Sequence, residues 1–78
     1  MSIGLILAGG RAMVRQGLAA LLHAESDITL LAQAADGEFA WTLITDHAPQ
    51  VAILDLELPK AGGIEIARRV EEIGRAHV

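Results

Sequence analysis

The chain has 78 residues, which allows one small domain near the lower size limit for a core that stabilises itself. Its hydrophobic content of 53% excludes a disordered chain, and its net charge of −4 argues against a nucleic-acid-binding face. It contains no cysteine, which excludes disulfides and thiolate metal sites. No stretch of the sequence predicts a signal peptide or a membrane span, so we expect a cytoplasmic protein.

Two strand-then-helix units occupy the first part of the chain. The first joins an apolar run at residues 3–8 to a helical pattern that begins at Arg11. The second joins a strand at residues 28–34 to a helix that Asp36 caps and Pro49 ends. The apolar stripes that we expect to face the core are Val14, Leu18, Leu21 and Leu22 in the first helix, and Phe39, Ala40, Leu43 and Ile44 in the second.

The third unit begins with the apolar run at residues 51–56 and continues into a helix from Gly63. A continuous run of this kind is typical of a strand that is buried on both faces of a parallel sheet. The helix is expected to end near Gly74, after an apolar stripe of Ile66, Val70 and Ile73. Strands that alternate with helices predict a single α/β domain with a parallel sheet and right-handed crossovers.

Asp55 is the residue with the clearest functional signal. It is a charged residue in an apolar strand segment, so we place it at the carboxyl end of that strand, where open α/β sheets bind ligands. The chain then turns at Pro59 and the glycine pair 62–63. The simpler alternative is that Asp55 only caps the turn after the strand.

Three segments occur in an order and at a spacing that identify a family. They are Met13-Val14-Arg15-Gln16-Gly17-Leu18-Ala19-Ala20-Leu21-Leu22, Ala34-Ala35-Asp36-Gly37-Glu38, and Asp55-Leu56-Glu57-Leu58-Pro59 with Gly63 four residues after the proline. Together they resemble the receiver domain of bacterial two-component response regulators, and most closely those with a LuxR-type helix-turn-helix output. The resemblance implies a flavodoxin-like, doubly wound fold with strand order 2-1-3. It also implies that residues 1–78 are a receiver truncated after the third helix, without the output domain.

By this resemblance, Asp55 is the phosphoacceptor, which takes a phosphoryl group from the phosphohistidine of a sensor histidine kinase. The family binds Mg²⁺ through an acidic pair after the first strand, the phosphoacceptor, and a backbone carbonyl two residues beyond it. Here Gly9 and Gly10 replace the acidic pair, which leaves Asp55 and the Glu57 carbonyl as weak metal ligands. The family's later hydroxyl residue and lysine belong to strands beyond this chain, and Lys60 is expected to be a solvated surface charge.

We therefore expect a degenerate receiver that is not an enzyme, binds no Mg²⁺ and is not efficiently phosphorylated. Within a transcription regulator of a phosphorelay, it would act through protein–protein contacts. Because an unprotected apolar edge strand pairs readily with another chain, we expect a homodimer or an exchange of elements through the third strand or third helix. No direct contact with nucleic acid or membrane is expected.

Two other interpretations remain open at this point. Residues 5–12 look like the opening of nucleotidyltransferases, in which a glycine-rich loop such as Gly9-Gly10 would bind a nucleoside triphosphate. That interpretation leaves residues 34–63 without an explanation. The other possibility is a purely structural assembly element.

Overall fold

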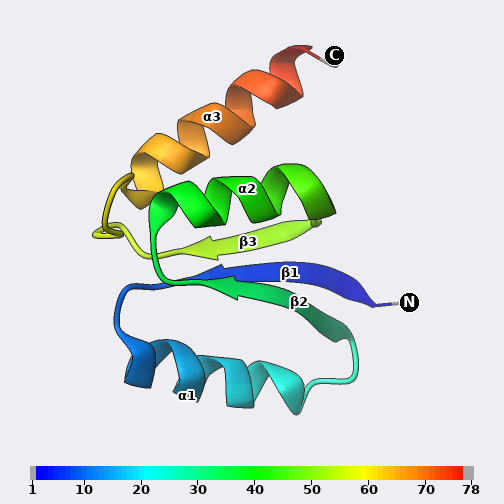
Figure 1. Ribbon diagram of the computed structural model, residues 1–78. Helices are drawn as coiled ribbons and strands as arrows, with labels where there is room; N and C mark the ends of the chain where they lie inside the picture. Colours follow the sequence, from blue (N-terminus) through cyan, green and yellow to red (C-terminus); the bar gives the residue numbers. More distant parts are fainter. Residues whose placement is uncertain (1, 77–78) are drawn as a thin grey trace.

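The computed structural model describes the backbone of residues 2–76 and the side chains as far as residue 72. In this part of the chain three strands alternate with three helices: β1 (Ile3–Ala8), α1 (Ala12–His23), β2 (Ile28–Ala34), α2 (Gly37–His47), β3 (Val51–Leu54) and α3 (Gly63–Ala76). The strands are parallel and lie in the order β2-β1-β3 (Figure 1). The predicted α/β class and strand order are confirmed.

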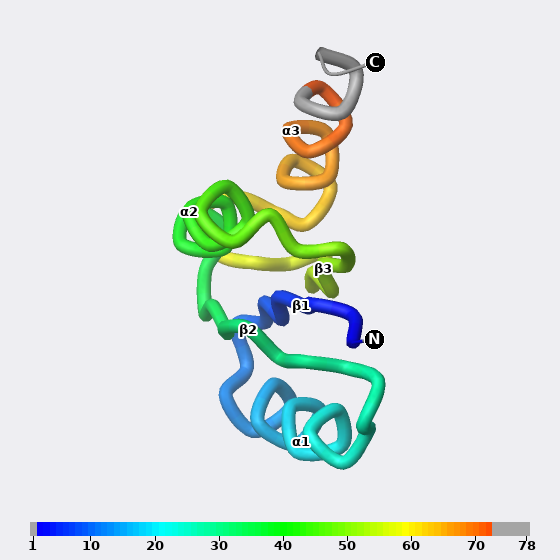
Figure 2. Tube along the Cα trace, turned by 90° about the vertical axis from the view of Figure 1, so that its right-hand side faces the viewer, coloured from blue at the N-terminus to red at the C-terminus, as the bar shows by residue number. Residues whose placement is uncertain are grey.

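The central strand β1 explains the layered arrangement. Its side chains alternate between the faces, so Leu5 and Leu7 pack with α1 while Ile6 and Ala8 pack with α2 and α3. Figures 1 and 2 show α1 on one side of the sheet and α2 with α3 on the other. Because β1 is buried on both faces, its sequence is apolar almost without interruption.

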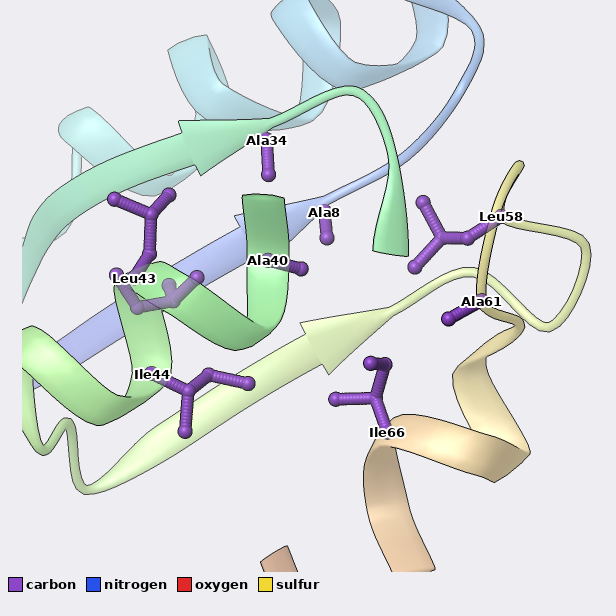
Figure 3. Packing of buried hydrophobic residues seen from close by; sticks show 9 residues of the cluster. Ala8, Ala34, Ala40, Leu43, Ile44, Leu58, Ala61 and Ile66 are labelled. Atoms are coloured by element: carbon purple, nitrogen blue, oxygen red, sulfur yellow. The ribbon is translucent and has the colours of Figure 1, made fainter. Parts of the chain in front are cut away.

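The two faces of the sheet carry hydrophobic clusters of unequal size. The smaller cluster, on the α1 side, consists of Leu5, Leu7 and Ala19. The larger cluster joins β1 and β2 to α2, to the loop after β3 and to the start of α3 (Figure 3); its buried members are Ile6, Ala8, Ala34, Ala40, Leu43, Ile44, Leu58, Ala61 and Ile66. Most of the core therefore lies on the side of α2 and α3.

The predicted apolar stripes are partly wrong. Val14 and Leu21 of α1 are 63% and 70% exposed, although Leu18 and Leu22 do pack against the smaller cluster. β3 is an edge strand, and among the described residues no element covers the flank of α1 beside it. Phe39 is also half-exposed, because α2 turns Gly37, Ala40, Leu43 and Ile44 toward the core instead.

Two predicted ends also need correction. β3 ends at Leu54 rather than at residue 56, because the Asp55 side chain accepts a hydrogen bond from the Glu57 N–H and turns the chain. α3 continues past Gly74 to Ala76. Val70 of its predicted stripe is exposed, and the side chain of Ile73 lies outside the described part. No helix among residues 2–76 is long and apolar enough to cross a membrane.

Candidate functional site

The residues that follow β1 and β3 meet at the carboxyl edge of the sheet. Asp55 donates its backbone N–H to the carbonyl of Ala8 at 3.0 Å, and Gly9 donates its N–H to the carbonyl of Ala34 at 3.0 Å. These bonds continue the sheet by one residue beyond β1 and β3. Asp55 therefore lies beside the Gly9-Gly10 turn, at the carboxyl end of its strand, as expected from the sequence.

Local contacts hold Asp55 in this place. Its Oδ1 accepts a hydrogen bond from the Glu57 N–H at 3.0 Å, which closes a tight turn, and the side chain is exposed to solvent. The backbone carbonyl of Asp55 faces Gly63, where a Cβ would lie only 2.6 Å from the carbonyl oxygen. The first residue of α3 is therefore packed directly against the Asp55 backbone, and only glycine allows this approach.

The loop after β3 is fixed by the beginning of α2. Gly37 donates its N–H to the carbonyl of Pro59 at 2.8 Å. Asp36 caps α2 by accepting from the Phe39 N–H at 2.8 Å, and its other carboxylate oxygen lies 3.8 Å from Lys60 Nζ. Lys60 has a left-handed backbone with φ 70°, and its side chain is largely exposed. This agrees with its predicted role as a surface charge, at the turn that positions Asp55.

The Gly9-Gly10 pair differs in how much space surrounds its two members. A Cβ at Gly9 would lie 3.9 Å from the Arg15 Cβ, which is an ordinary contact. A Cβ at Gly10 would lie 3.2 Å from the Pro59 Cδ, so a side chain there would press on the loop. The fold therefore accepts a carboxylate at position 9 more readily than at position 10.

Arg11 and Arg15, to which the sequence patterns assigned no role, lie at the carboxyl edge of the sheet. The Arg15 Nη1 donates to the carbonyl of Gly9 at 2.7 Å in a partly buried contact. A cavity of about 170 Å³ lies between α1 and β3. Its lining includes both arginines and Asp55; the other lining residues are Leu7, Ala8, Gly9, Val14, Leu18, Ile53 and Leu54. The sequence signal was the four-residue spacing of the arginines, which places both on one side of the helix start.

These residues do not fit a magnesium site. Mg²⁺ requires oxygen ligands in near-octahedral geometry, usually including one or two carboxylates. Within residues 2–76, no three Asp, Glu, His or Cys side chains gather where they could hold a metal ion. Among the residues that line the cavity, Asp55 supplies the one carboxylate. Arg11 and Arg15 are positively charged, and their charge opposes the binding of a metal cation nearby.

Comparison with known sequences identifies the family. A family model described as the response regulator receiver domain matches residues 6–78. The protein-glutamate methylesterase/protein-glutamine glutaminase 2 of Shewanella sp. (strain MR-4) is 31% identical over 70 residues, which are 90% of this chain and 20% of that protein. The transcriptional regulatory protein LiaR of Bacillus subtilis is 35% identical over 68 residues, which are 87% of this chain and 32% of LiaR. The chain thus spans between a fifth and a third of these relatives.

Comparison with solved structures identifies the same family. The signal receiver domain of NarL from Mycobacterium tuberculosis superposes with a TM-score of 0.91 at 26% identity, covering 94% of this chain and 59% of that one. A LuxR-family DNA-binding response regulator from Staphylococcus aureus superposes with a TM-score of 0.88 at 32% identity, covering 92% and 60%. These similarities confirm the flavodoxin-like receiver fold, and none favours a nucleotidyltransferase. The chain belongs to the response regulator receiver domain family.

Proposed function

We propose that this receiver is the signal-receiving part of a two-component transcription regulator with a LuxR-type output, and that it acts through protein–protein contacts rather than as an enzyme. The same segment matches proteins named as methylesterases and proteins named as transcription regulators. What these relatives share is therefore the receiver rather than an activity. The similarity to LiaR and to LuxR-family structures supports the choice of a DNA-binding output.

The observation that carries the proposal is the position of Asp55, which is exposed beside the end of β1. Its backbone N–H is hydrogen-bonded to the Ala8 carbonyl, and its own carbonyl is packed closely against Gly63. We propose that Asp55 occupies the phosphoacceptor position and that a sensor histidine kinase is the partner of the whole protein. With Gly9 and Gly10 in place of carboxylates, phosphoryl transfer lacks charge stabilisation. Removing one such group costs about 10²–10³ in rate, so we expect inefficient phosphorylation and no resident Mg²⁺.

Incubation with acetyl phosphate and Mg²⁺, followed by intact-mass measurement, tests this proposal. We expect no stoichiometric phosphoryl adduct under conditions that fully modify a receiver with its acidic pair. Asp55→Asn serves as the matched control, because it removes the carboxylate nucleophile and keeps a similar shape. A stoichiometric adduct on the unaltered chain that disappears in Asp55→Asn would contradict the proposed degeneracy.

We also propose that the receiver self-associates through β3 or α3. β3 pairs with β1 alone among the described strands, so one of its edges has free backbone donors and acceptors. Val51 and Ile53 of this strand are 41% and 37% exposed, and Ile64 and Val70 of α3 are exposed as well. Neither Lys nor Pro interrupts β3, so the strand is a template for pairing with a second copy, most simply as a two-fold dimer.

A further inference from the structure

We propose that the outer face of α1 is a second self-association surface, which binds α1 of another copy of this chain in antiparallel orientation. The inference goes beyond the proposed function, in which copies associate through β3 or α3. Figures 1 and 2 show α1 alone on its side of the sheet. Among residues 2–76, no element therefore covers the face of α1 that points away from the strands.

An apolar stripe runs along this outer face. Val14 and Leu21 are largely exposed, and Leu18 between them is partly buried. Together with Gly17, these residues have the i, i+3, i+4, i+7 spacing of one helix face. A Cβ built at Gly17 would have no atom within 4 Å, so the stripe has a gap at its middle. We call these four residues the outer stripe of α1.

The order of residues in the outer stripe is self-complementary in an antiparallel pair. When a two-fold axis passes beside Gly17 and Leu18, Val14 of each copy lies opposite Leu21 of the other. Leu18 of each copy then lies opposite the gap at Gly17 of the other, which leaves room for it. Helices pack in this way, with side chains of one in the gaps of the other, at about 8–10 Å between axes. A parallel two-fold pair would instead place gap against gap.

The charges beyond the two ends of the outer stripe also select the antiparallel orientation. Arg11 precedes α1 and Arg15 lies in its first turn, whereas Glu25 and Asp27 follow its end. Residues 16–24 between them contain no Asp, Glu, Lys or Arg. An antiparallel second copy brings its Glu25 and Asp27 toward Arg11, whereas a parallel copy brings arginine to arginine and carboxylate to carboxylate. This charge complementarity identifies a second copy as the partner that fits the face.

The start of α1 lacks the acidic groups found at the starts of the other two helices. Helix starts favour carboxylates because their free N–H groups carry partial positive charge. α2 has Asp36 as its cap and Glu38 in its first turn, and α3 has Glu65. α1 has no acidic residue in its first turn, and its N-cap Arg11 makes no side-chain cap hydrogen bond. Glu25 of an antiparallel second copy would supply the carboxylate that α1 lacks.

Disulfide trapping tests the contact, because the chain has no cysteine of its own. Val14→Cys and Leu21→Cys each place a single thiol at an exposed position, so the fold should tolerate both. The two variants are mixed, oxidised and analysed by mass spectrometry. We expect the mixed disulfide in about tenfold excess over its random proportion, because a disulfide requires a Cβ–Cβ separation of about 3.5–4.5 Å. Met13→Cys mixed with Leu21→Cys is the matched control: Met13 is exposed on another side of α1 and should give the random proportion.

Charge reversal connects the orientation to the ends of the helix. Arg11→Glu in both trapping chains should lower the yield of the mixed disulfide roughly fivefold, because carboxylates would then face each other. Adding Glu25→Arg to the same chains should restore the yield, since opposite charges meet again. Arg68→Glu, at an exposed position on α3, should leave the yield unchanged.

Trapping in the background of Ile53→Lys separates this contact from association through β3. We expect the mixed disulfide to persist there, because the lysine blocks only the strand edge. Four results would overturn the inference: a mixed disulfide at the random proportion, an excess of symmetric disulfides, a yield unchanged by Arg11→Glu, or loss of trapping in Ile53→Lys. The random proportion would show that a second copy is not what covers this face. None of these results bears on Asp55, whose phosphorylation the intact-mass measurement decides.

Discussion

Gly37 lies so close to the backbone carbonyl of Ala61 that a side chain at position 37 would overlap it. The Gly37 N–H also donates to the Pro59 carbonyl at 2.8 Å. The first turn of α2 and the loop before α3 are thus packed backbone against backbone. This contact holds the buried residues Leu58 and Ala61 in the larger cluster (Figure 3) and fixes the loop that begins at Asp55.

Replacing Gly37 with alanine should therefore separate the loop from α2. We expect Gly37→Ala to lower the free energy of unfolding by about 1–3 kcal/mol or more, because a Cβ cannot fit without moving backbone atoms. Urea unfolding followed by circular dichroism measures the change. Gly17→Ala is the matched control: Gly17 is exposed within α1 and has no atom within 4 Å of its built Cβ. It should instead raise the free energy of unfolding by about 0.5–1 kcal/mol, and equal signs for the two variants would contradict the packing.

The cap of α2 should contribute through one oxygen of Asp36 rather than through its charge. Asp36→Ala removes the 2.8 Å hydrogen bond to the Phe39 N–H and should cost about 0.5–2 kcal/mol of unfolding free energy. Asp36→Asn keeps an acceptor and loses only the 3.8 Å ion pair with exposed Lys60, so it should stay near the unaltered chain. Urea denaturation of both variants in parallel measures the two changes. Equal losses of unfolding free energy in Asp36→Ala and Asp36→Asn would show that the charge of Asp36 matters more than its hydrogen bond.

Self-association through β3 should disappear when a charged side chain replaces an exposed apolar residue of this strand. Ile53→Lys places an ammonium group on the edge strand, where it opposes pairing with a second copy. Light scattering across a dilution series should show association of the unaltered chain at micromolar concentration and a smaller species for Ile53→Lys. Met13→Lys, at an exposed position on α1, should not change the association. A folded, monodisperse monomer of the unaltered chain would refute the proposal.

Restoring carboxylates at Gly9 and Gly10 should recover some affinity for Mg²⁺. We expect Gly9→Asp with Gly10→Asp to bind Mg²⁺ roughly tenfold more tightly than the unaltered chain, as each added carboxylate supplies a charged ligand. Calorimetric titration measures this. Gly9→Asp alone should lower the free energy of unfolding less than Gly10→Asp alone, because only a side chain at position 10 would press on Pro59. Phosphorylation of Asp55 should remain slight, and efficient phosphorylation of the double variant would show that the glycines are the whole defect.

The elements and their order could be predicted because their signals are local. The apolar runs, the Asp36 cap and the stop at Pro49 each depend on a few neighbouring residues, and the placement of Asp55 followed from them. Burial could not be predicted in the same way. Val14 and Phe39 have the spacing of core residues, but their exposure depends on which elements lie opposite them. The Arg15 contact with Gly9 depends on side-chain geometry, which periodicity does not describe.

The unequal clusters on the two faces have a consequence for how the domain opens. α1 has one buried residue, Ala19, and packs on the smaller cluster, whereas α2 contributes several residues to the larger one. Native-state hydrogen exchange should therefore find the amides of α1 less protected than those of α2, as a separate unit that detaches before the rest unfolds. Arg15 would leave with it, carrying its guanidinium away from the strand ends.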